Sequence, residues 1–130
     1  MNCIRETFEK VDELLDAHLQ YSEANYQQAF CYLLSKHGTV EKECVVQYSF
    51  TDGDCPVIYG SGRIDVVFRK HGSDTVYIIE LKISPKHYRI QNYMPQVQRY
   101  MLHYPYKKTQ GVIICWSPHG SKMSPVQKAP

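Results

Sequence analysis

Two apolar segments with charged residues at fixed positions constrain the fold of this chain most. The first, at 60–68, reads GSGRIDVVF, and the second, at 77–83, reads YIIELKI. Both are rich in β-branched residues and a short polar turn separates them, so we expect two adjacent strands. Side chains alternate along a strand, which places Glu80 and Lys82 on one face and turns Leu81 into the core. Asp65 lies on the neighbouring strand.

Two carboxylates and an ammonium on hydrophobic strands are costly to bury unless the protein uses them. A divalent metal ion is the simplest use, because Mg²⁺ prefers oxygen ligands and a nearby lysine suits a scissile phosphate. The pattern of Asp65, Glu80 and Lys82 therefore predicts metal-dependent hydrolysis of phosphodiester bonds.

Length and composition set the frame for this site. The chain has 130 residues, of which 43% are hydrophobic and 22% charged, as in an ordinary globular domain. We expect one domain over residues 1–116, and a flexible tail over 117–130, which is rich in Pro, Ser, Lys and Gly. The formal net charge of +2 is too small to argue for nucleic-acid binding by itself. Attraction to phosphate must come from how the charges are distributed.

The sequence also bears on location. No apolar run approaches the roughly 18 residues of a membrane span, and the charged start MNCIRETFEKVDELL does not resemble a signal peptide. The five cysteines form no C-x-x-C pair, so we expect free thiols, with Cys31 and Cys115 in the core. These features predict an intracellular protein, cytoplasmic or nuclear, that is not secreted and has no membrane partner.

Hydrophobic periodicity predicts the element order αα-βββ-α-β. Ser22 can cap the second helix, and Glu23 lies in its first turn, where the helix dipole favours an acid. Glu41 and Glu43 alternate onto one face of the first strand, which we expect to be the solvated face of an edge strand. The expected helices are 4–19, 22–37 and 95–104, and the expected strands are 40–50, 57–70, 75–83 and 111–116.

Four motifs in this order resemble the PD-(D/E)XK nuclease superfamily, and within it the small GxxExxY proteins. The motifs are the helix SEANYQQAFCYLLSKHG, the strand acid in GRID, the strand ELK and the helix QVQRY. The resemblance runs from about Gln20 to Trp116. The chain departs from the family pattern at Gln20, where the family has glycine, and at Ile64, where the superfamily has proline before the acid.

The resemblance implies an α/β fold with a restriction-endonuclease-like αβββαβ core, a central mixed sheet flanked by helices, and here an extra N-terminal helix. It implies one Mg²⁺ or Mn²⁺ held by the carboxylates of Asp65 and Glu80, with the Leu81 carbonyl and Glu23 as further ligands. For Glu23 the alternative is that it only stabilises the helix start.

Lys82 would position or deprotonate the attacking water and offset charge on the phosphate. The alternative for Lys82 is a plain salt bridge to Glu80 or Asp65. Gln96 and Tyr100 lie one helical turn apart on one face, where they could hold a phosphate oxygen and orient a carboxylate or Lys82. Ordinary helix polarity and core packing would explain these two residues equally well.

Basic and aromatic residues around the cleft could contact nucleic acid. Arg63 shares the face of Asp65, and it could pair with Glu23 or contact phosphate. A basic rim could add to it or be an ordinary solvated surface, and tyrosines could stack on bases or simply fill space. The further candidates are Lys86, Arg99 and Tyr26. We expect a nucleic-acid partner, with DNA ahead of RNA, and leave open a homodimer or a protein partner. Two alternatives to a nuclease are a catalytically silent nucleic-acid-binding module and an interaction subunit that uses a sheet edge.

Overall fold

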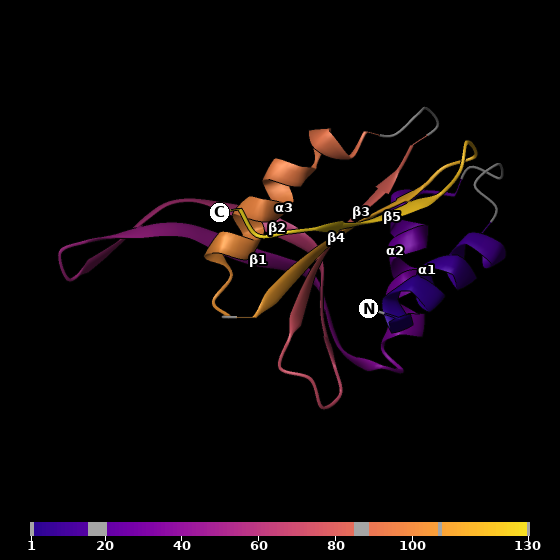
Figure 1. Ribbon diagram of the computed structural model, residues 1–130, viewed down its shortest axis with the longest axis horizontal. Helices are drawn as coiled ribbons and strands as arrows, with labels where there is room; N and C mark the ends of the chain where they lie inside the picture. Colours follow the sequence, from indigo (N-terminus) through magenta and orange to yellow (C-terminus); the bar gives the residue numbers. More distant parts are fainter. Residues whose placement is uncertain (1, 16–20, 85–88, 107, 130) are drawn as a thin grey trace.

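The computed structural model describes residues 2–15, 21–84, 89–106 and 108–129 of the chain (Figure 1). Three α-helices and five strands account for most of these residues, with a single 3₁₀ turn, η2, at Ile90–Asn92. The helices are α1 (Asn2–Leu14), α2 (Glu23–Leu34) and α3 (Met94–His103). The strands are β1 (Gly38–Asp52), β2 (Cys55–Lys70), β3 (Val76–Ile83), β4 (Thr109–Trp116) and β5 (Lys122–Val126).

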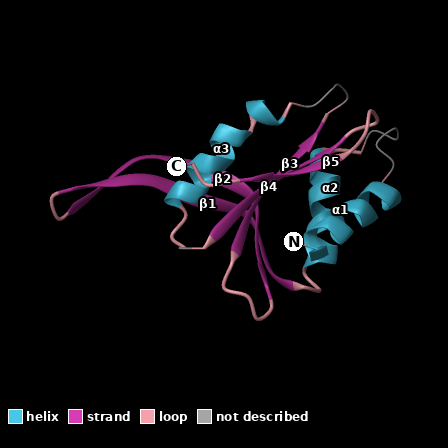
Figure 2. Ribbon diagram, viewed as in Figure 1, coloured by secondary structure: helices cyan, strands magenta, loops and turns pink. Residues whose placement is uncertain are grey.

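The strands form one mixed sheet in the order β1-β2-β3-β4-β5 (Figure 2). Only β3 and β4 are parallel, and the chain passes between them through η2 and α3. The other neighbours are antiparallel. The β3 strand has neighbours on both edges and is apolar on both faces for most of its length, as a central strand should be. The expected mixed sheet flanked by helices is therefore confirmed.

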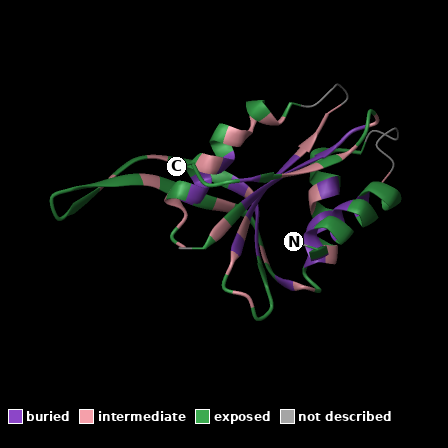
Figure 3. Cartoon of the chain, viewed as in Figure 1, coloured by how far each residue is buried: buried purple, intermediate pink, exposed green. Residues whose placement is uncertain are grey.

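The helices divide the core into two layers, one on each side of the sheet (Figure 3). On one side α1 and α2 pack against Val66, Phe68, Ile79 and Leu81. On the other side α3 packs against Ile64, Val67, Ile78 and Ile113. The assignment of Ile79 to one layer and Ile78 to the other shows the side-chain alternation of β3 directly.

The first layer is centred on Trp116, at the end of β4. Its ring centroid lies 4.9 Å from that of Tyr26 and 5.9 Å from that of Phe30, both on α2. Its indole N–H donates to the Phe8 main-chain oxygen at 3.3 Å. One fully buried side chain thus joins the sheet to both N-terminal helices.

The start of α2 is as the sequence predicts. Ser22 is the N-cap, and its hydroxyl accepts a hydrogen bond from the Asn25 N–H. The Asn25 side chain in turn accepts from the Ser22 N–H, which completes a capping box. Glu23 is the first helical residue. The cap fixes where α2 begins, and so where Glu23 lies relative to the sheet.

Most of β1 and β2 forms a two-stranded ribbon that leaves the sheet. The two strands pair from Gly38↔Lys70 to Asp52↔Cys55, whereas β2 pairs with β3 only over Val66–Phe68. Residues 45–63, which we call the arm, therefore have no third strand beside them, and the arm extends well beyond the body in Figure 1.

The segment 117–130 differs from the expected flexible tail. Residues Lys122–Val126 form β5, which pairs antiparallel with β4 from Gly111↔Val126 to Cys115↔Lys122. Val126 is buried against the α3 layer. The polar composition concealed this strand, because β5 is short and lies at the sheet edge, where Pro125 can be tolerated.

Within the part of the chain that the structure describes, no helix is both long and apolar enough to cross a membrane. All five cysteines are free, and Cys31 and Cys115 are buried as predicted.

Trp116→Ala should lower the free energy of unfolding by about 3–5 kcal/mol, because it leaves a cavity beneath both N-terminal helices. Leu14→Ala is the matched control: Leu14 is 58% exposed on α1, so its loss should cost well under about 1 kcal/mol. Denaturant unfolding followed by circular dichroism measures both. Equal losses in the two variants would contradict the central position of Trp116.

Candidate functional site

The candidate site lies where β2 separates from β3. The last main-chain pair between them on this side is Val66↔Ile79. One residue further, the Asp65 carboxylate accepts a hydrogen bond from the Leu81 N–H at 2.8 Å. A side-chain oxygen thus satisfies a main-chain donor that the strand partner no longer reaches. The separation of the two strands inserts the Asp65 carboxylate between them.

Glu80 is the most buried charged group of the site, with only 4% of the residue exposed. Its Oε1 lies 3.3 Å from Lys82 Nζ. Its Oε2 is buried and accepts no hydrogen bond from the described donors, so when Glu80 is protonated the proton is shared with the neighbouring Asp65 carboxylate. Burial first, and then the charge of Asp65, raises the pKa of Glu80 from 4.5 to about 8. An acid in this environment favours either a proton or a cation at this oxygen.

The pKa values of Asp65 and Lys82 are shifted by the same neighbouring groups. Burial raises the pKa of Asp65, although the Leu81 N–H and Lys82 oppose the shift. Burial lowers the pKa of Lys82, but the charges of Glu80, Glu23 and Asp65 outweigh it, so the net shift is upward. Lys82 Nζ also lies 5.0 Å from the centroid of the Tyr93 ring. Lys82 is therefore a firmly protonated ammonium in the metal-free site.

Glu23 approaches the site from the start of α2. It lines a cleft of about 180 Å³ together with Gln27, Glu43, Asp65 and Lys82. Burial raises the pKa of Glu23, Lys82 lowers it and Asp65 raises it again. Glu23 thus belongs to the same electrostatic environment as the strand acids, in addition to its position at the helix start.

Gln27 and Glu43 are two members of the cleft that the sequence motifs did not indicate. Gln27 Nε2 donates to the Asp65 main-chain oxygen at 3.0 Å and lies 3.2 Å from Glu43 Oε1. Gln27 is one helical turn after Glu23, so the i, i+4 spacing of two polar residues was the available signal. Gln27 ties α2 to the strand that holds the site acid.

The prediction that Glu41 and Glu43 share one face is wrong. Glu43 has a φ of 54°, in the left-handed region that L-residues rarely adopt, and this interrupts the alternation of β1. Glu43 therefore enters the site cleft, whereas Glu41 lies beside Tyr104 in a separate cleft on the α3 face. Arg63 pairs with Glu43, its Nε 4.0 Å from Oε2, and its partner is not Glu23.

Gln96 and Tyr100 lie on α3, as expected, and they contact each other. Gln96 Nε2 donates to the Tyr100 hydroxyl at 2.6 Å. Burial raises the pKa of Tyr100, and the charge of Glu80 raises it further. Tyr100 packs in the α3 layer, so its ring fills the core while its hydroxyl is held by Gln96 at the edge.

The structure places two of the further residues expected to contact nucleic acid. Tyr26 is fully buried beside Trp116, and its hydroxyl donates to the Leu15 main-chain oxygen, so it cannot stack on a base. The Arg99 guanidinium lies 5.6 Å from the Tyr48 ring centroid, at the base of the arm. Lys86 falls outside the described residues.

The donor set bears on whether a metal ion fits. Among the described residues, no group of three or more His, Cys, Asp or Glu side chains is arranged to hold a metal ion. The possible metal ligands at this site are the carboxylates of Asp65 and Glu80, and Leu81 lines the adjoining cleft. The buried Oε2 of Glu80 and the raised pKa values of both acids are what a hard divalent cation would relieve. The residues therefore fit such a cation through oxygen ligands.

No known family model matches this chain, and no curated protein matches it. Among solved structures, the chain resembles the crystal structure of SSO0001, with a TM-score of 0.58 and 16% sequence identity. The match covers 98% of this chain and 63% of that one, so the chain spans less than two thirds of its structural neighbour. At this identity the likeness shows a shared fold alone.

The raised pKa of Glu80 predicts a pH-dependent stability. A folded pKa of about 8 against 4.5 means that the folded protein holds a proton that the unfolded chain releases. The stabilisation is complete below pH 4.5 and is lost as pH rises through about 8. Without metal, the free energy of unfolding should fall between about pH 5 and pH 8, and Glu80→Gln should flatten this slope.

Urea unfolding in EDTA at several pH values measures how the free energy of unfolding changes with pH. The control is Glu41→Gln, which removes an acid from the opposite face and should keep the wild-type dependence. The same slope in wild type and Glu80→Gln would contradict the pKa assignment.

Proposed function

We propose that this chain is a metal-dependent nuclease with a restriction-endonuclease-like fold, of the PD-(D/E)XK type. The observation that supports it most is the meeting of Asp65, Glu80 and Lys82 where β2 separates from β3, with one buried oxygen of Glu80 that accepts no hydrogen bond from the described donors. A fold alone does not define an activity, so the proposal depends on this site.

The element order supports the fold assignment. A helix, three antiparallel strands, a helix and a strand parallel to the third follow one another from α2 to β4. The acid lies on the second strand and the E-x-K sequence on the third, in agreement with the motif order of the superfamily. The helix α1 then precedes this core, and β5 extends the sheet beyond it.

Asp65 and Glu80 would hold Mg²⁺ or Mn²⁺. The resemblance implies the Leu81 carbonyl and Glu23 as further ligands; among the described residues Glu23 does not join the two strand acids in a three-carboxylate group, so it would act through the cleft that it lines. Such an ion would supply Lewis-acid polarisation of a phosphate oxygen and a more acidic bound water. The hydrogen bond from the Leu81 N–H fixes one oxygen of Asp65 and so orients its carboxylate. Gln27 fixes the main chain of the same residue.

Lys82 acts through its positive charge. The carboxylate of Glu80 and the ring of Tyr93 hold its ammonium at the cleft. A protonated lysine there stabilises the negative charge that develops on the phosphate. Accepting a proton from water would require the neighbouring carboxylates to be neutralised first, because their charges raise the pKa of Lys82. The salt bridge to Glu80 thus serves to position Lys82.

The remaining polar residues suit substrate binding. Gln96 donates to the hydroxyl of Tyr100, whose pKa the charge of Glu80 raises, so its amide could hold a phosphate oxygen or a water on the α3 side of the site. Arg63 is exposed at the cleft side of the arm and offers a guanidinium to a phosphate. We assign DNA as the substrate in preference to RNA. The five free thiols suit a reducing intracellular compartment, cytoplasmic or nuclear.

The test is cleavage of labelled single-stranded, duplex and branched DNA, and of RNA, with Mg²⁺, Mn²⁺ or EDTA. Wild type should cut in a metal-dependent manner. Lys82→Ala should reduce the rate by about 10²–10⁴-fold with unchanged metal affinity, because it removes charge stabilisation but no ligand. Asp65→Ala and Glu80→Ala should abolish both cleavage and metal binding.

Two controls match these variants in chemistry. Lys70→Ala removes a lysine from the far end of β2, and Glu41→Ala removes an acid from the opposite face. Both should cleave like wild type. Normal turnover in Lys82→Ala would refute its role, and metal binding without any cleavage would favour a silent nucleic-acid-binding module.

A further inference from the structure

The arm exposes large apolar side chains far from the site cleft. Phe50 is 54% exposed and Tyr59 is 58% exposed, on a ribbon whose outer part pairs with no other strand. A two-stranded ribbon of this kind is marginally stable in water by itself. Exposed aromatic side chains on such an element are typical of an interaction surface.

The aromatic residues form a continuous row on one face of the arm. The Phe50 ring centroid lies 5.7 Å from that of Tyr59, and Tyr59 lies 6.2 Å from Tyr48. The row continues onto α3, because the Tyr59 hydroxyl lies 3.1 Å from His103 Nε2. Leu102, which precedes His103 on α3, is 71% exposed. These contacts hold the row in a fixed arrangement before any partner binds.

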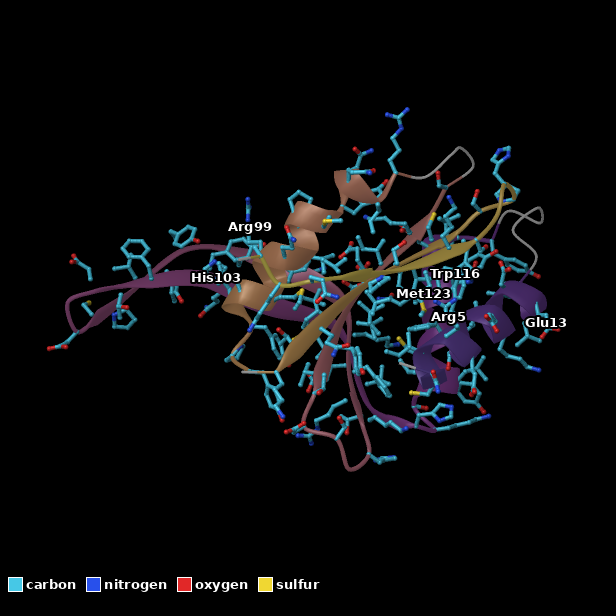
Figure 4. All side chains as sticks on the ribbon, viewed as in Figure 1. Arg5, Glu13, Arg99, His103, Trp116 and Met123 are labelled. Carbon is cyan, nitrogen blue, oxygen red and sulfur yellow. The ribbon has the colours of Figure 1, made fainter. Side chains whose placement is uncertain are left out.

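The two ends of the row carry opposite charges. The cation at the base of the arm is Arg99, on the α3 side beside His103, as Figure 4 shows; the His103 Nδ1 accepts a hydrogen bond from the Ser49 N–H. Asp52 and Asp54 lie at the tip, on either side of the turn at Gly53. Among the described residues none of Arg99, Asp52 and Asp54 forms an ion pair, so these charges are available to a partner.

We propose that this aromatic face packs against the same face of a second copy of the chain, with the two arms antiparallel about a two-fold axis. That arrangement places each acidic tip against the basic base of the other arm and buries both aromatic rows. A surface that is basic at one end and acidic at the other is self-complementary under a two-fold axis. This dimer does not depend on the proposed nuclease activity.

The charge pattern favours a second copy over nucleic acid. Aromatic rows can stack on unpaired bases, and Arg99 could contact phosphate. The tip, however, presents the carboxylates of Asp52 and Asp54 and no basic residue, so it would repel a phosphate backbone. The base of the arm in a second copy offers the cation that the tip lacks.

Sedimentation equilibrium of the full chain tests the proposal. Wild type should be a dimer in the micromolar range, and Phe50→Ser should raise the dimer dissociation constant by about tenfold or more. Ile58→Ser is the matched control: it removes a side chain of similar exposure, 58%, from a position that pairs across the arm with Ser49, between the aromatic positions Tyr48 and Phe50 of β1 and so on the other face. It should leave the dimer intact. Circular dichroism and thermal unfolding confirm that each variant is folded.

A charge exchange tests the antiparallel arrangement. Arg99→Glu alone and the pair Asp52→Lys with Asp54→Lys should each be monomeric, because like charges meet at both ends of the interface. An equal mixture of the two proteins should form dimers that contain one of each, since both contacts then join opposite charges. Failure of the mixture to associate would overturn the arrangement.

A monomeric wild type at about 100 μM would overturn the proposal, because that concentration exceeds the dissociation constants of most functional dimers. A monomer that binds single-stranded DNA and loses this binding in Phe50→Ser would overturn it in favour of base stacking.

Discussion

The hydrogen bond from the Leu81 N–H to the Asp65 carboxylate organises the candidate site. It lies where the ladder between β2 and β3 ends, and a side chain there takes the donor that a strand partner would otherwise use. The bond fixes a carboxylate beside Glu80. Beyond this point β2 is paired only with β1, and the two strands form the arm.

The site retains an electrostatic arrangement that folding alone would not favour. Two partly or fully buried acids face one lysine, an oxygen of Glu80 accepts no hydrogen bond from the described donors, and the pKa of Glu80 rises to about 8. A hydrophobic residue at Glu80 would pack with less cost, because burying a charge is expensive. Strain of this kind collects at functional sites, and the left-handed φ of Glu43 in the same cleft is a second instance.

The sequence was sufficient to predict the elements from α1 to β4 and the strands that carry Asp65, Glu80 and Lys82, but neither β5 nor the details that complete the site. Strand alternation and β-branched runs correctly placed Asp65, Glu80 and Lys82, because those signals are local. The positive φ of Glu43 arises from the tertiary structure, so regular alternation put Glu43 on the wrong face. For Tyr26 the helical spacing with Phe30 and Leu33 favoured the core, and the structure decides for packing over base stacking. The strand β5 was missed because its pairing with β4 is a long-range contact.

We propose that Asp65 and Glu80 together hold a divalent cation. A crystal structure of the protein soaked in Mn²⁺, with anomalous scattering recorded near the manganese edge, tests this. We expect an anomalous peak in contact with the carboxylates of both Asp65 and Glu80, at Oε2 of Glu80. No peak at saturating Mn²⁺, or a peak that touches neither acid, would show that the two acids form no such site.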